Sequence, residues 1–128
     1  MKRRTGPVVI VGAGQAAAAL ARGLRENGFA GPIRMLGEEP QPPYERPPLS
    51  KQVLIEGRAP DALWLLGDDA QRAQGVTLST STRVTRIDRA ARQVMTDAGE
   101  AIPYETLVLA TGGAARRLPD LPVDGRRV

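Results

Sequence analysis

The hydrophobic pattern at the start of the chain predicts a strand, a tight turn and a helix. Residues 8–11 are four consecutive apolar β-branched residues, as in a strand buried within a parallel sheet. Residues 15–27 are mainly alanine, leucine, arginine and glutamate, which are strong helix formers, and Gly28 stands where a helix commonly ends. A largely apolar run at 33–36 predicts the next strand. This order of elements is typical of an α/β fold with parallel strands.

The second half of the chain shows shorter patterns. Residues 61–66 form an apolar stretch in which Trp64 is expected to act as a packing anchor. Residues 68–73 begin with two acids and predict a short surface helix. Alternating apolar and polar positions over 76–104 predict an antiparallel β-meander, and 106–110 predicts a last buried strand.

The turn after the first strand has the spacing Gly-x-Gly-x-x-Ala of a nucleotide-binding turn. Gly12 would allow a sharp turn, Gly14 would let a pyrophosphate approach the backbone, and the small Ala17 would let the helix pack closely. The free N–H groups and partial positive charge of the helix N-terminus would then attract the phosphates. An ordinary tight turn without a ligand is the alternative interpretation.

An acid follows the second predicted strand, at a spacing from the glycine turn that is typical of nucleotide-binding folds. Glu38 lies about 20 residues beyond the glycine turn, where a carboxylate accepts hydrogen bonds from the ribose hydroxyls of an adenosine. The last predicted strand runs into Thr111, Gly112 and Gly113, which places backbone N–H groups at the carboxyl edge of the same sheet. Two such signals in one chain favour FAD over a lone NAD site.

A proline-rich segment lies between these signals. Residues 40–48 contain five prolines, which predicts a stiff, extended loop, and 49–55 has a short helical pattern. The loop would position Arg46 and Lys51 beside the end of the second strand, where the two cations could meet a ligand. A polyproline docking peptide and an interdomain linker are the alternatives for this segment.

Composition narrows the classes of function. The 128 residues, 41% of them hydrophobic, suit one small domain and are short for a complete dinucleotide-dependent enzyme. The net charge of +4 comes from scattered arginines, so no nucleic-acid partner is expected, whereas a polyanionic dinucleotide or an acidic protein is compatible with it. The sequence has no cysteine and no histidine, which excludes thiol redox chemistry and argues against any metal site in this chain.

The N-terminus has the outline of a secretory signal, with basic residues at 2–4 before an apolar segment. Gln15 and two glycines interrupt that segment, and no apolar run reaches the length of a membrane span. We therefore expect a cytoplasmic protein without a membrane partner.

The run from Tyr44 to Lys51, YERPPLSK, is the most specific motif in the chain. Together with the preceding Gly37 and Glu38 and the glycine turn, it resembles the N-terminal FAD segment of the FAD-dependent ferredoxin reductases, within the pyridine nucleotide-disulfide oxidoreductase superfamily. These enzymes oxidise NAD(P)H and serve Rieske-type dioxygenases and cytochromes P450. The resemblance implies a Rossmann-like, glutathione-reductase-type FAD-binding domain, in which a parallel sheet carries an inserted antiparallel β-meander.

The resemblance also implies roles for individual residues. Glu38 would hold the adenosine ribose, and Lys51 would lie near the isoalloxazine ring and tune flavin reactivity. The backbone of Val84 would contact the adenine, although its position in the pattern is simply that of an inward-facing strand residue. The full set of expected cofactor-binding residues is Gly12, Gly14, Ala16, Ala17, Glu38, Arg46, Lys51, Val84, Ala110, Thr111 and Gly112. No residue of the chain is expected to be catalytic in its own right.

The resemblance extends over 8–119 and covers only the first part of the family's length. We expect 1–119 to be the N-terminal part of an FAD-binding domain and 120–128 to begin a linker to an absent NAD(P)H domain. NAD(P)H would bind only in that missing domain, and the full enzyme would pass electrons to a ferredoxin-type iron–sulfur protein. The chain by itself would then be inactive.

Two other functions are compatible with the glycine turn. The first is a stand-alone dinucleotide-binding sensor or interaction module without catalysis. The second is a small NAD-dependent dehydrogenase, which the absence of a Tyr-x-x-x-Lys pair disfavours.

Overall fold

A computed structural model describes residues 5–114 and 116 of the chain, so the expected boundary at 119 and the expected linker at 120–128 lie outside the described residues. The elements are β1 (Val8–Val11), α1 (Gln15–Glu26), β2 (Ile33–Leu36), the 3-10 helices η1 (Pro47–Ser50) and η2 (Pro60–Leu63), α2 (Asp68–Gln74), β3 (Val76–Ser79), β4 (Val84–Asp88), β5 (Gln93–Thr96), β6 (Ala101–Pro103) and β7 (Thr106–Leu109).

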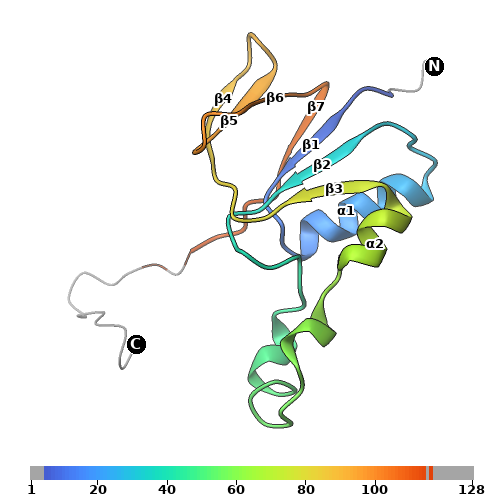
Figure 1. Cartoon of the computed structure of the whole chain (residues 1–128), viewed down its shortest axis with the longest axis vertical. Helices are drawn as coiled ribbons and strands as arrows, with labels where there is room; N and C mark the ends of the chain where they lie inside the picture. The colour runs from blue at the N-terminus through green and yellow to red at the C-terminus, as the bar shows by residue number, and fades with distance from the viewer. Residues whose placement is uncertain (1–4, 115, 117–128) are drawn as a thin grey trace.

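Four strands form a parallel sheet in the order β3-β2-β1-β7 (Figure 1). The strands are in register at their carboxyl ends, because Val11 pairs with both Leu36 and Leu109, and Leu36 pairs with Ser79. The segments that leave these strands therefore emerge along one edge of the sheet. The predicted parallel α/β sheet and its first two strands are confirmed.

Both faces of the sheet are covered, which explains its apolar strands. On one face Val8 and Ile10 of β1 pack in a cluster with Ala17 and Ala21 of α1. On the other face Val9 packs in a cluster with residues of the antiparallel sheet. Figure 1 shows this arrangement, with α1 and α2 on one side of the parallel sheet and the antiparallel sheet β4-β5-β6 on the other.

The antiparallel sheet is confirmed as an insertion before the last strand, but the prediction assigned one strand to it wrongly. Val76–Ser79 pairs in parallel with β2, through Ile33 and Val76, and so belongs to the first sheet. Its side chains explain the placement, since Val76 and Leu78 join the cluster on the α1 face. Helix α2 immediately precedes β3 and contacts it, which supplies a crossover that a parallel neighbour of β2 needs.

An ion pair joins the two sheets. Arg34 of β2 donates from Nη1 to Oε1 of Glu100 at 2.8 Å and from Nη2 to Oε2 at 3.1 Å. Glu100 lies in the turn between β5 and β6. This bidentate ion pair adds a polar link between the two layers beside the apolar cluster of Val9, Leu36, Val94 and Ile102.

Residues 40–66 make an excursion away from the sheet, drawn in teal and green at the bottom of Figure 1. The predicted helical pattern at 49–55 is realised as η1 followed by turns, without an α-helix. Trp64 is not the anchor that was expected, because it is 43% exposed, whereas Leu63 and Leu66 are buried. None of the helices within the described residues is long and apolar enough to cross a membrane.

Candidate functional site

The carboxyl edge of the parallel sheet brings together the three segments that the sequence singled out. The N–H of Gly12, after β1, donates to the carbonyl of Leu36 at 2.8 Å, and the N–H of Ala110, after β7, donates to the carbonyl of Val11 at 2.8 Å. The N–H of Gly37, after β2, donates to the carbonyl of Ser79 at 2.9 Å. The glycine turn, the acidic segment and the Ala110–Gly112 segment thus lie side by side.

The two glycines of the turn serve different needs. Gly12 has φ of +110°, and a Cβ there would lie 2.1 Å from the carbonyl oxygen of Ala110, so the protein's own packing requires a glycine. Gly14 has an extended backbone, and a Cβ there would meet nothing within 4 Å. The space over Gly14 is therefore open, as a pyrophosphate lying against the backbone would require.

Helix α1 begins at this open space without a cap. The first helical N–H to be paired is that of Ala18, which donates to the carbonyl of Gly14 at 3.1 Å. The N–H groups of Gln15, Ala16 and Ala17 come before it and have no acceptor within the helix. No side chain caps the helix, and its first turn contains no acid. This N-terminus suits an anionic phosphate.

Gly37 is a site-forming residue whose role the sequence did not reveal. A Cβ at Gly37 would lie 2.5 Å from the Cβ of Ala13, in the glycine turn. Because Gly37 has no side chain, the end of β2 can lie close to the glycine turn after β1. In the sequence Gly37 stands directly after a predicted strand and belongs to the motif that carries the resemblance, but neither signal indicated this close approach to Ala13.

The two adjacent acids after β2 have different surroundings. Glu38 has a side chain that is 71% exposed, and its nearest cation is Arg83, with Nη1 3.7 Å from Oε1. Glu39 is engaged through both oxygens, since Oε2 accepts from the hydroxyl of Tyr44 at 2.7 Å and Oε1 accepts from Nη2 of Arg46 at 2.5 Å. Of the two, Glu38 is the carboxylate that is available to a ligand.

The resemblance to known proteins can be judged against this geometry. Residues 6–127 match the family model described as pyridine nucleotide-disulphide oxidoreductase. The chain belongs to this family.

Individual members of the family resemble the chain closely over its length. It is 45% identical over 112 residues to putidaredoxin reductase of Pseudomonas putida, covering 88% of this chain and 26% of that protein. It is 47% identical over 116 residues to the ferredoxin–NAD(+) reductase component of the anthranilate 1,2-dioxygenase system of Burkholderia cepacia, covering 86% and 27%. The chain thus spans about a quarter of the length of these relatives.

Solved structures show the same fold. The putidaredoxin reductase in a covalent complex with putidaredoxin superposes with a TM-score of 0.80 at 40% identity, covering 91% of this chain and 28% of that one. A ferredoxin reductase from Rhodopseudomonas palustris superposes with a TM-score of 0.83 at 39% identity, with the same coverage. The predicted membership of the ferredoxin reductase family and the predicted fold are therefore confirmed.

The two cations that were expected to meet a cofactor, Arg46 and Lys51, lie in the excursion at 40–66. Arg46 is held by Glu39, and its guanidinium lies 5.4 Å from the centroid of the Tyr44 ring. Lys51 is exposed at the end of η1, and within the described part of the chain it makes no ion pair. Within the part of the chain that the structure describes, no hydrogen bond or ion pair joins Lys51 to the glycine turn.

Val84 begins β4 and is half-buried, packed against the cluster that contains Val9 and Leu36. The ladder with β5 is irregular between Val84 and Arg86. The side chain thus has a packing role, as its pattern position indicated, and the role expected for its backbone stays a prediction. Arg83, which faces Glu38, was not anticipated.

Thr111 and Gly112 are exposed beyond β7, and Gly112 has φ of +66°. The neighbouring Ala110 is half-buried and packs against the α1-face cluster. These residues complete the edge on the β7 side of the glycine turn.

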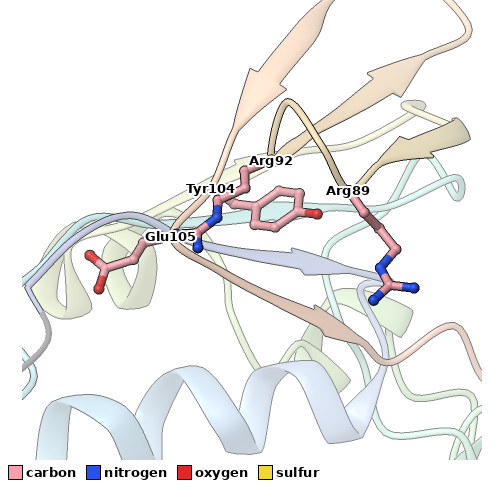
Figure 2. A pocket seen from close by; sticks show the side chains of 4 residues that line it. All are labelled: Arg89, Arg92, Tyr104 and Glu105. Atoms are coloured by element: carbon pink, nitrogen blue, oxygen red, sulfur yellow. The ribbon is translucent and has the colours of Figure 1, made fainter.

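A cavity of about 270 Å³ lies elsewhere, lined by Arg89, Arg92, Tyr104 and Glu105 (Figure 2). The N–H of Glu105 donates to the carbonyl of Pro7 at 2.9 Å, which places this cavity beside the amino ends of β1 and β7. It is separate from the carboxyl edge and does not form part of the candidate site. Within the described residues, no group of three or more carboxylates is arranged to hold a metal ion.

The contact between Tyr44 and Glu39 predicts a pH dependence of stability. The hydrogen bond to the Glu39 carboxylate raises the pKa of Tyr44 above its ordinary value of 10.0, with burial and the charge of Glu39 acting in the same direction and Arg46 opposing them. A raised folded-state pKa means that this contribution is present at neutral pH and is lost as the pH rises above about 10. We expect Tyr44→Phe to flatten the alkaline fall in the free energy of unfolding, measured by urea denaturation. An equally steep fall in the variant would contradict the assignment.

Proposed function

We propose that the chain binds FAD at the carboxyl edge of its parallel sheet, as the FAD-binding part of an NAD(P)H-dependent ferredoxin reductase. One observation carries the proposal: the uncapped N-terminus of α1 faces open space over Gly14 on the same edge as the available carboxylate of Glu38. The names of the relatives support the choice of reaction, since they include ferredoxin and rubredoxin reductases.

Each residue then has a task in holding the cofactor. The free N–H groups at Gln15, Ala16 and Ala17 would bind the pyrophosphate, and the carboxylate of Glu38 would accept hydrogen bonds from the adenosine ribose. Arg46 and Lys51 would add positive charge beside the phosphates and the flavin. The backbones of Val84 and of 110–112 would border the adenine and the ring system.

When bound, FAD converts the two-electron chemistry of NAD(P)H into the one-electron chemistry of an iron–sulfur protein, for a cytochrome P450 or a Rieske dioxygenase. We place the binding of NAD(P)H and of the ferredoxin-type partner outside residues 1–119, which would form the N-terminal part of the FAD domain. By itself the chain is expected to bind FAD without oxidising NAD(P)H.

A titration of the purified chain with FAD tests the proposal. Saturable quenching of flavin fluorescence at one FAD per chain is the expected result, with NAD+ binding much more weakly. Absence of FAD binding would contradict the proposal, and preferential binding of NAD+ would favour a different dinucleotide module.

Glu38→Gln provides a test at the level of one residue. Because a hydrogen bond to a charged group contributes about 1.5–3 kcal/mol, the affinity for FAD should fall at least about tenfold. The affinity for ADP should fall by the same factor, since ADP carries the same ribose. The melting temperature should hardly change, because Glu38 is largely exposed and 3.7 Å from its cation.

The matched control is Glu26→Gln, an exposed acid near the C-terminal end of α1. It removes the same charge at a distance from the edge and should leave the affinity for both ligands unchanged. Equal losses in the two variants would show that net charge, and not a ribose contact, explains the effect.

A further inference from the structure

The excursion at 40–66 leaves and rejoins the sheet through a narrow neck. The N–H of Glu45 donates to the carbonyl of Leu63 at 3.0 Å, and the N–H of Leu65 donates to the carbonyl of Pro43 at 2.7 Å. Between them Tyr44 and Trp64 form an isolated antiparallel bridge. The neck is thus a two-stranded contact, and 46–62, including η1 and most of η2, lie beyond it.

Glu39 stands at the point where the chain leaves the sheet. Its carbonyl accepts a hydrogen bond from the N–H of Ser81 at 3.0 Å, which ties its backbone to the segment after β3. Its side chain reaches the other way, with one oxygen on Tyr44 in the neck and the other on Arg46 just beyond it. The guanidinium of Arg46 lies over the Tyr44 ring, so the three side chains form a closed group.

Arg46 and Lys51 are joined by the short 3-10 helix η1, whose backbone is stiff. Arg46 is the N-cap of η1, whose first two residues are Pro47 and Pro48 with fixed φ. The carbonyl of Arg46 accepts from the N–H of Leu49 at 3.1 Å, and the carbonyl of Pro48 accepts from the N–H of Lys51 at 3.1 Å. The backbone between Arg46 and Lys51 is therefore constrained.

We propose that Glu39 is a positioning residue, whose carboxylate holds Arg46 and thereby orders η1, the 3-10 helix that leads to Lys51. The two adjacent acids then have different roles. Glu38 remains available to the ligand, and Glu39 orders the loop that carries Arg46 and Lys51. The effect on FAD rests on the proposed function, but the ordering of the loop does not.

Hydrogen exchange of the unliganded chain tests the ordering directly. Glu39→Gln should accelerate exchange of the hydrogen-bonded amides of η1 and the following turns, from Leu49 to Ile55, by about fivefold, as expected for the loss of a surface charge contact. Glu45→Gln is the matched control, because Glu45 is an exposed acid in the same loop and its side chain makes no hydrogen bond or ion pair within the described residues. Equal exchange in wild type and Glu39→Gln would overturn the proposal.

FAD affinity, measured well below the melting temperature, tests the route through Arg46. Glu39→Gln should weaken binding about fivefold, and it should have no further effect in an Arg46→Gln background. A residue that only stabilised the fold would lower the melting temperature and leave the affinity unchanged. An undiminished effect in the Arg46→Gln background would overturn the route. If the wild-type chain binds no FAD while Glu39→Gln still accelerates exchange, the proposed function fails and the positioning role stands.

Discussion

Gly12→Ala is expected to lower the stability of the chain by about 4 kcal/mol, which is a large part of the 5–15 kcal/mol typical of a whole domain. Two penalties combine at this position. An alanine is strained at φ of +110°, and its methyl group would lie 2.1 Å from the carbonyl oxygen and 2.5 Å from the carbonyl carbon of Ala110. Both are backbone atoms of the segment after β7, so no side chain can rotate away. A fall in melting temperature of more than about 10 °C, followed by circular dichroism, is the expected measurement.

Gly14→Ala is the matched control, and it separates folding from binding. The new methyl group would point into open space and the backbone there is extended, so stability should change by less than about 1 kcal/mol. The same methyl group would occupy the space assigned to the pyrophosphate, so the affinity for FAD should fall at least about tenfold. An unchanged affinity would show that no phosphate lies against Gly14, and a stable Gly12→Ala variant would contradict the close approach of β1 and β7.

The parts of the fold that the sequence predicted are those whose signal lies within one short stretch of the chain. Residues 8–11 are apolar at every position because both faces of their strand are buried, and α1 ends before Gly28, which has φ of +78°. Val76–Ser79 could not be assigned to a sheet in this way. Its alternating pattern fits either sheet, and its place beside β2 depends on the crossover that α2 provides.

In the candidate site, too, the features with a local signal in the sequence were predictable and the others were not. The spacing of Gly12 and Gly14 was informative because the turn they make is local. The separate surroundings of Glu38 and Glu39 were not predictable, since the two are identical in the sequence and differ only through Tyr44, Arg46 and Arg83. The packing role of Gly37 was likewise not predictable, because the side chain that it must leave room for belongs to Ala13, in the turn of the chain after β1.

Arg25 was missed entirely, yet it joins three parts of the fold. Its Nε donates to the carbonyl of Gln74 at 2.6 Å and its Nη2 to that of Gly75 at 2.9 Å, both at the end of α2. Its Nη1 donates to the carbonyls of Phe29 and Gly31 at 2.6 and 2.8 Å, in the loop between α1 and β2. The carbonyls at the end of α2 come from about 50 positions away in the chain, so nothing in the helix pattern distinguishes this arginine from its neighbours.

We expect Arg25→Ala to lower the free energy of unfolding by about 3 kcal/mol, because four carbonyls lose a charged donor and three of these contacts are partly buried. Arg25→Lys should recover only a part of this, since an ammonium group cannot reproduce the guanidinium fork. Urea denaturation of the purified chain gives both values.

Arg22→Ala is the control for this result, one turn earlier on the same helix. Arg22 is 63% exposed and its Nε lies 3.9 Å from Oε1 of Glu26, so its loss should change stability by less than about 0.5 kcal/mol. Similar losses for Arg22→Ala and Arg25→Ala would mean that the helix, and not the junction with α2, is what the arginines stabilise. A selective loss at Arg25 would instead establish that this side chain couples α1 to the end of α2 and to the loop before β2.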